Sequence, residues 1–131
     1  MKKRSLLVTI ALTGALAGGG LAGATSASAA TCYGSYKSFY KSDGTQYAPT
    51  GNSYWSATSN CDDINIKIPN AKSVKVCFYK KPSGSLNYCQ TNYKTTRANE
   101  WTAIATDVND GTIYRFKFAD ADYNRSGFYA S

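Results

Sequence analysis

Four cysteines constrain the fold of this chain more than any other feature. Cys32, Cys61, Cys77 and Cys89 all lie in the C-terminal hundred or so residues. Their spacing does not fit a zinc site, because no two cysteines are two residues apart and the chain contains no histidine. An even number of cysteines in a small exported domain predicts two disulfides. Three pairings are possible in principle.

The N-terminal residues have the order of regions found in a secretory signal peptide. Basic residues at 2–4 precede an apolar run at 6–16, and small residues follow up to Ala30. The apolar run is shorter than the roughly 20 residues that a permanent membrane anchor needs. We therefore expect residues 1–30 to be a signal peptide and residues 31–131 to form a single secreted domain without membrane attachment.

Alternating apolar residues predict β-structure along most of this domain. The segments Ile64–Ile68 and Val74–Phe78 have apolar residues at alternate positions, a period that places one face of each strand in the core. The turn-like residues between them predict a hairpin in which the apolar residues share one face. In that register Lys67 and Lys75 lie directly opposite each other on the solvent side.

The next turn, at residues 81–85, predicts a second hairpin. Centring it on Ser83 places Cys77 opposite Cys89, close enough for a bridge at a non-hydrogen-bonded rung. This register favours the pairing Cys77–Cys89 and leaves Cys32–Cys61 as the second bridge.

A third turn completes the predicted fold. Asp110-Gly111 separates β-like runs at 101–108 and 112–118 and predicts another hairpin. The chain is therefore expected to be all-β, a small two-sheet sandwich (or barrel) of about seven antiparallel strands held by two disulfides.

Residues that could support catalysis are scarce. Without histidine, neither a Ser-His-Asp nor a Cys-His arrangement can be built. The single glutamate, Glu100, lies beside Trp101 but has no obvious partner carboxylate for glycoside hydrolysis. We expect no enzymatic activity.

One segment carries oxygen ligands at alternate positions. Asp120, Asp122 and Asn124 have a spacing that calcium loops use, although Arg125 stands where an EF-hand has glycine. Calcium is the one ion this segment could bind, and no other cofactor is expected. The alternative is that these residues simply form a turn.

Aromatic residues are unusually frequent. The chain has 11 Tyr, 5 Phe and 2 Trp, all outside the predicted signal peptide. Exposed rings with a polar tip suit sugars or a protein partner, whereas buried ones fill sheet faces by cross-strand packing. The ring candidates for binding lie in the N-terminal third of the domain: Tyr33, Tyr36, Tyr40, Tyr54 and Trp55.

The charge of the domain is mildly basic. The chain carries a net charge of +7, of which residues 2–4 supply three, leaving +4 for residues 31–131. This is less than the dense Lys/Arg stripe typical of nucleic-acid binding, so no nucleic-acid partner is expected. The basic candidates for binding are Lys67, Lys75, Lys80 and Lys81.

These features predict a secreted, non-catalytic binding module for an extracellular or cell-wall polysaccharide or a protein surface. Two alternatives remain open. One is an inhibitor of a secreted hydrolase that presents the loop at residues 80–84, and the other is a cell-surface or coat protein. In plan the chain is similar to the small two-disulfide bacterial amylase inhibitors. Those carry a Trp-Arg-Tyr triplet, where the nearest segment here is Ser53-Tyr54-Trp55-Ser56, so no family is assigned.

Overall fold

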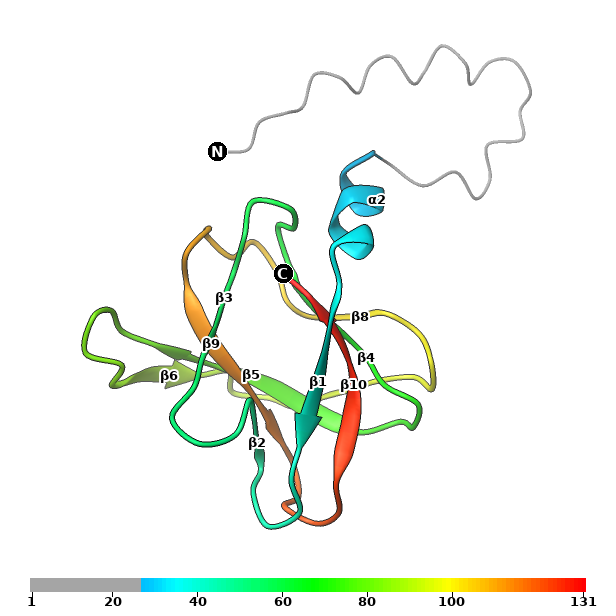
Figure 1. Ribbon diagram of the computed structural model, residues 1–131, viewed down its shortest axis with the longest axis vertical. Coiled ribbons are helices and arrows are strands. Elements are labelled where there is room, and N and C mark those ends of the chain that lie inside the picture. The colour runs from blue at the N-terminus through cyan, green and yellow to red at the C-terminus, as the bar shows by residue number, and fades with distance from the viewer. Residues whose placement is uncertain (1–26) are drawn as a thin grey trace.

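The computed structural model describes residues 27–131, so the predicted signal peptide lies almost entirely outside the described residues. The described part begins with one helix and continues as short strands (Figure 1). In chain order the elements are α2 (Ala27–Gly34), β1 (Lys37–Lys41), β2 (Tyr47–Ala48), β3 (Trp55–Ser56), β4 (Ile64–Lys67), β5 (Ser73–Tyr79), β6 (Leu86–Cys89), β7 (Lys94–Thr95), β8 (Thr102–Ala105), β9 (Ile113–Phe118) and β10 (Arg125–Ala130). No helix within residues 27–131 is long and apolar enough to cross a membrane.

The strands form two antiparallel sheets that pack face to face. The four-stranded sheet has the order β1-β10-β4-β8, and the six-stranded sheet has the order β2-β9-β5-β6, with β3 beside β9 and β7 beside β5. Figure 1 shows β5 of one sheet crossing behind β1 and β10 of the other, rather than running along them. The all-β, two-sheet prediction is confirmed. The strand count exceeds seven because three of the strands contain only two residues each.

The core lies between the two sheets and follows the alternation of the longer strands. In β9, Tyr114, Phe116 and Phe118 are almost fully buried, while the residues between them face outward. They pack against apolar residues of the facing sheet, including Ile64 and Ile66 of β4. The period of two therefore sorts inward from outward residues correctly.

Both predicted disulfides are confirmed. Cys77 and Cys89 are opposed on β5 and β6, and Phe78 faces Tyr88, as the second hairpin predicts. Cys32 of α2 is bonded to Cys61, just before β4.

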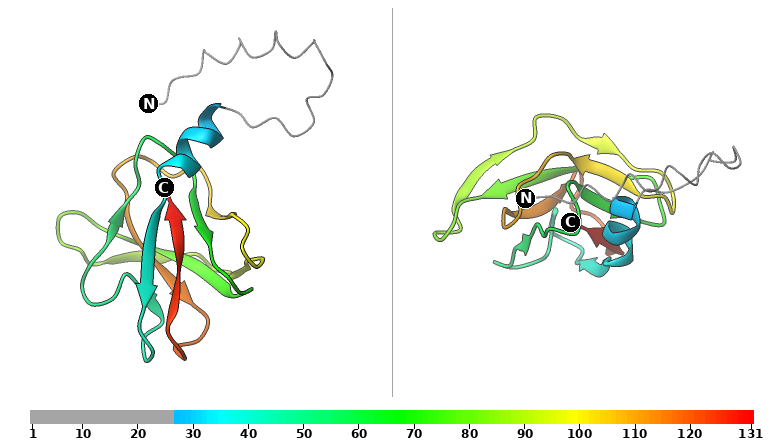
Figure 2. Two further views of the ribbon diagram at one scale, coloured as in Figure 1. Left: turned by 45° about the vertical axis from the view of Figure 1, so that its right-hand side comes forward. Right: turned by 90° about the horizontal axis from the view of Figure 1, so that it is seen from above.

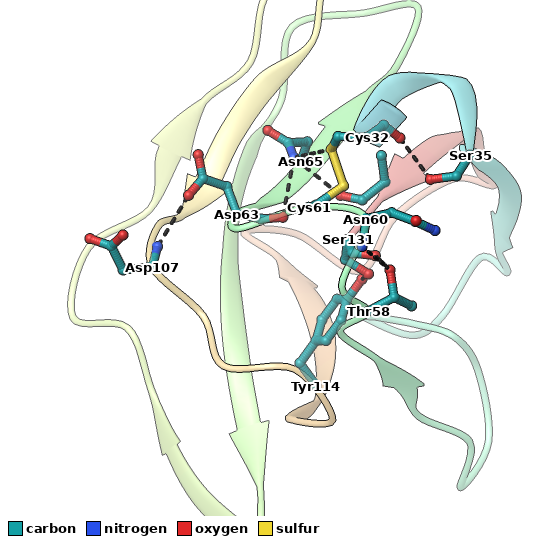
Figure 3. The surroundings of a disulfide bond; sticks show 11 residues. Cys32, Ser35, Thr58, Asn60, Cys61, Asp63, Asn65, Asp107, Tyr114 and Ser131 are labelled. Carbon is teal, nitrogen blue, oxygen red and sulfur yellow. Dashed lines mark hydrogen bonds between the residues drawn. A yellow bond between two sulfur atoms is a disulfide. The ribbon is translucent and has the colours of Figure 1, made fainter. Parts of the chain in front are cut away.

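The second bridge covers one end of the outer face of the four-stranded sheet (Figure 3). There the buried amide of Asn65 donates to the carbonyls of Asp63 and Ala130, both at 3.2 Å, and lies 3.6 Å from the Cys32 sulfur. A buried amide with these partners avoids the cost of an unpaired donor.

Two of the predicted hairpins are wrong. β4 pairs with β10 and β8, whereas β5 belongs to the other sheet. Ile68 is therefore not opposite Val74, and Lys67 is not opposite Lys75; their partners are Phe128 and Lys117. The runs on either side of Asp110-Gly111 are likewise split between the sheets, as β8 and β9. Both sheets present an apolar inner face, so alternation alone cannot distinguish a hairpin from a crossover between sheets.

Candidate binding surfaces

An aromatic surface occupies the outer face of the four-stranded sheet. β1 alternates so that Phe39 and Lys41 point into the core while Ser38 and Tyr40 point out. The left view of Figure 2 shows β10 beside β1, and Phe128 of β10 pairs with Ser38. We call this surface the aromatic face and define it by Tyr33, Tyr36, Tyr40, Lys67, Trp101 and Phe128.

Ring contacts fix one half of the aromatic face. Tyr33 stacks on Trp101 with a centroid distance of 4.9 Å and an interplanar angle of 10°, and both pack against the Cys32–Cys61 bridge. Tyr36 tilts against Trp101 at 6.3 Å and meets Phe128 edge-on at 5.1 Å. The Lys67 ammonium lies 5.8 Å from the Trp101 ring centroid, within range of a cation–π interaction. These contacts position the rings before any ligand arrives.

The other half of the aromatic face is open. The exposed fractions of Tyr36, Tyr40 and Phe128 are 53%, 54% and 40%. Because Phe128 pairs with Ser38, it lies between the two tyrosines, and the row extends about 13 Å at the usual rise of a strand. Such rigid rings supply contact area at little entropic cost.

A hollow of about 360 Å³ adjoins this row. Phe128 and Lys67 line it together with hydroxyl and amide groups from Ser38, Asn99 and Ser126. Apolar area combined with a few polar groups is typical of small-ligand sites. The combination suits a sugar, which offers both ring faces and hydroxyls.

The two remaining ring candidates lie elsewhere. Trp55 is partly buried against the core and stacks on Tyr129 at 4.0 Å, which corrects the expectation that it is an exposed ring. Tyr54 packs on Tyr79 at 4.8 Å on the six-stranded sheet, and its hydroxyl donates to the Gly84 carbonyl at 2.8 Å. Tyr54 thereby contacts the turn between β5 and β6.

The candidate lysines are distributed over three places. Lys67 belongs to the aromatic face, and Lys75 lies on the outer face of the six-stranded sheet. Lys80 and Lys81 are exposed at the turn after β5, where Gly84 donates to the Lys80 carbonyl at 2.7 Å. No common basic surface joins Lys67 to the other three.

The predicted calcium segment forms the loop between β9 and β10. Asp120 accepts from Arg125 at 3.4 Å, Asn124 accepts from the Asp43 amide at 2.9 Å, and Asp122 is exposed. Within the described part of the chain, no group of three or more acidic, histidine or cysteine residues is arranged so that it could hold a metal ion. Calcium binding here stays a prediction.

The same loop holds a buried ammonium. Lys41 is 0% exposed, and its Nζ donates to the carbonyls of Ser42, Thr45, Ala121 and Tyr123 at 2.7–3.4 Å. Burial, followed by the nearby Arg125 guanidinium, lowers the pKa of Lys41 from its ordinary value. This contact joins the β1–β2 loop to the β9–β10 loop.

Comparison with known protein families, with curated proteins and with solved structures finds no match for this chain. Its surfaces must therefore be interpreted from their own chemistry.

Several residues of these surfaces were not predicted from the sequence. Trp101 and Phe128 complete the aromatic face, for which the predicted candidates were Tyr33, Tyr36, Tyr40 and Lys67. Alternation in β9 could have indicated that Arg115 and Lys117 point outward, because Tyr114, Phe116 and Phe118 take the inward positions. What single-sequence reasoning lacked was the order of the strands.

Proposed function

We propose that this chain is a secreted, non-catalytic binding module that holds a polysaccharide on its aromatic face. The observation that carries the proposal is the open row of Tyr36, Phe128 and Tyr40 beside a hollow lined by hydroxyl, amide and ammonium groups. Sugar rings pack their C–H faces on aromatic rings, and their hydroxyls need hydrogen-bond partners nearby. Both requirements are met on one sheet face.

The surrounding structure supports a rigid site. Strands β1 and β10 carry the row, and stacking against Trp101 anchors Tyr33 next to it. Sites on regular strands hold their geometry better than sites on loops. Secretion agrees with the two disulfides, which persist in oxidising compartments.

The test is a pull-down of the disulfide-intact protein on insoluble cellulose, chitin, xylan and starch. It is done at about 1 M salt, where the screening length falls to about 3 Å and charge contributes little. We expect retention on at least one polymer, and at least a tenfold weaker affinity for the variant Tyr36→Ala/Tyr40→Ala/Phe128→Ala. A tenfold loss corresponds to about 1.4 kcal/mol, which one buried stacking contact can supply.

The matched control is Tyr88→Ala. Tyr88 lies on β6 of the other sheet and is 55% exposed. The control variant therefore removes a ring of similar exposure that lies away from the aromatic face. Equal retention of the triple variant and the wild type, at equal thermal stability, would refute the proposal. Capture of a secreted hydrolase instead of any polysaccharide would favour the inhibitor alternative.

A further inference from the structure

The outer face of the six-stranded sheet carries a second, chemically different surface. On β5 and β9 the outward positions hold Lys75, Arg115 and Lys117, whose neighbours are tyrosines. We call this surface the cationic face and define it by Lys75, Arg115, Lys117, Tyr47, Tyr54, Tyr79 and Tyr93. None of these seven residues is acidic.

Two lysines are directly opposed at the centre of this face. Lys75 and Lys117 are Cα partners in the β5–β9 ladder. Opposed residues of an antiparallel pair have Cβ atoms about 4.5–5.5 Å apart, and from this rung the Lys75 ammonium extends over Tyr93 and the Lys117 ammonium over Tyr47. The two ion pairs among the described residues, Arg97–Glu100 and Arg125–Asp120, include neither lysine. Within residues 27–131, the two lysines therefore place two positive charges on one rung without an ion-paired carboxylate.

Arg115 adds a third positive charge to the cationic face, and its position is fixed. Its guanidinium lies 4.7 Å from the Tyr47 ring centroid and 5.9 Å from those of Tyr54 and Tyr79. Its Nη2 donates to the carbonyls of Pro49 and Gly51 at 3.0 and 2.7 Å, and its buried Nε has no hydrogen-bond partner. The charge is therefore held in place next to the lysine pair.

Cations cover the rings of this face. Lys75 lies 4.5 Å from the Tyr93 centroid, and Lys117 and Arg115 both lie over Tyr47. Tyr47, Tyr54 and Tyr79 are half-buried and Tyr93 is 36% exposed, so these rings offer less free surface for stacking a base or a sugar than Tyr36 and Tyr40 do. The cationic face therefore offers a ligand positive charge along one rung of a rigid sheet.

We propose that the cationic face binds the acidic groups of an anionic extracellular polymer, with carboxylates or phosphates contacting Lys75, Arg115 and Lys117. Charge complementarity carries this inference, because three cationic side chains share one sheet face and attract a chain of anionic groups. A nucleic acid is the less favoured polyanion, because its tight binding also uses base stacking on open aromatic rings. The site does not depend on the aromatic face.

The experiment measures the affinity of the disulfide-intact protein for soluble polygalacturonate, poly(glycerol phosphate), neutral dextran and a single-stranded oligothymidylate. We expect one or both anionic polymers to bind with an affinity that falls at least tenfold between about 0.05 and 0.5 M salt, as screened charge requires, and any binding of dextran to be unaffected by salt. Binding of polygalacturonate alone assigns carboxylate, and binding of poly(glycerol phosphate) alone assigns phosphate.

Variants distinguish polyanion binding at the cationic face from binding that depends only on the net positive charge of the protein. Lys75→Ser/Lys117→Ser should weaken polyanion binding at least tenfold, whereas Lys37→Ser/Lys72→Ser, with the same change in net charge, should weaken it less than threefold. Lys75→Glu places an opposite charge across from Lys117, so it should abolish binding while raising the melting temperature. That combination cannot arise from misfolding.

Several outcomes would overturn the inference. They are equal losses for the two double variants, polyanion binding that is insensitive to salt, an equal loss of dextran binding in Lys75→Ser/Lys117→Ser, or tighter binding of the oligothymidylate at equal charge. The variant Tyr36→Ala/Tyr40→Ala/Phe128→Ala should leave polyanion affinity unchanged, so failure of this proposal is distinguishable from failure of the polysaccharide site on the aromatic face.

Discussion

Replacing Lys41 by methionine tests whether a buried ammonium organises one end of the sandwich. Methionine keeps the length and most of the volume of the side chain but removes its charge and its donors. In the wild type, the two shortest bonds run from Nζ to the carbonyls of Thr45 at 2.7 Å and Tyr123 at 3.0 Å. These bonds connect the loop that follows β1 to the loop that precedes β10.

The expected cost follows from those contacts. A hydrogen bond to a charged group contributes about 1.5–3 kcal/mol, so two good ones amount to about 3–6 kcal/mol. Part of this is recovered, because the variant no longer buries a charge and water can reach the loop carbonyls. We expect a net loss of about 2–4 kcal/mol in the free energy of unfolding. For a domain of this size that lowers the melting temperature by roughly 10–25 °C.

The assay is urea unfolding of the disulfide-intact proteins, followed by tryptophan fluorescence. The control is Lys37→Met, since Lys37 lies on the same strand but is exposed, and it should stay within about 0.5 kcal/mol of the wild type. Should Lys41→Met also stay within that limit, the carbonyl contacts would have no net stabilising role and our reasoning would be refuted.

Three further predictions concern stability. Replacing both cysteines by serine in the α2 bridge, which spans 29 residues, should cost about 3.6 kcal/mol in urea unfolding, against about 2.8 kcal/mol for the β5–β6 bridge, which spans 12. The reverse order would argue against loop entropy. Burial raises the pKa of Tyr114, whose hydroxyl donates to Ser131, above its ordinary 10.0, so the native state holds the proton longer and stability falls above about pH 10. Tyr114→Phe should flatten that fall, and an unchanged pH profile would contradict the burial. Gly127→Ala places a methyl group 2.5 Å from Ile68, which should cost about 1–3 kcal/mol by overpacking. Gly34→Ala, with open space around the new methyl group, should be nearly neutral in the same urea unfolding assay.

The sequence was sufficient to predict contacts between residues that are close together in the chain. The Cys77–Cys89 rung follows from a short turn between two strands, so counting outward from the turn gives the register. The pairing of Lys67 with Phe128 and of Lys75 with Lys117 joins residues far apart in the chain. The alternation of apolar residues predicts that these lysines face outward, but it does not predict which residues of the neighbouring strand they pair with.

The two tryptophans illustrate the same limit for the binding surface. Trp55 lies on a two-residue strand, too short to show any period, and pairing with Tyr114 turns its ring toward the core. Trp101 stands just before β8 and reaches the outer face, where Tyr33 stacks on it. Each ring is directly followed by a hydroxyl residue, Ser56 or Thr102, so only the tertiary structure separates the buried ring from the one on the surface.

The two outer faces differ in what covers their rings, and this difference predicts independent sites. On the aromatic face, rings contact one another and leave Tyr36, Tyr40 and Phe128 open, so binding there should resist salt. On the cationic face, ammonium and guanidinium groups cover the rings, so binding there should depend on salt. The faces point away from each other across the core, and a short oligosaccharide cannot contact both. Effects of variants on the two faces should therefore add, because distant sites without shared partners do so. A long polymer could join both faces only by wrapping around an edge or by linking two molecules, and it would then gain avidity that short fragments lack.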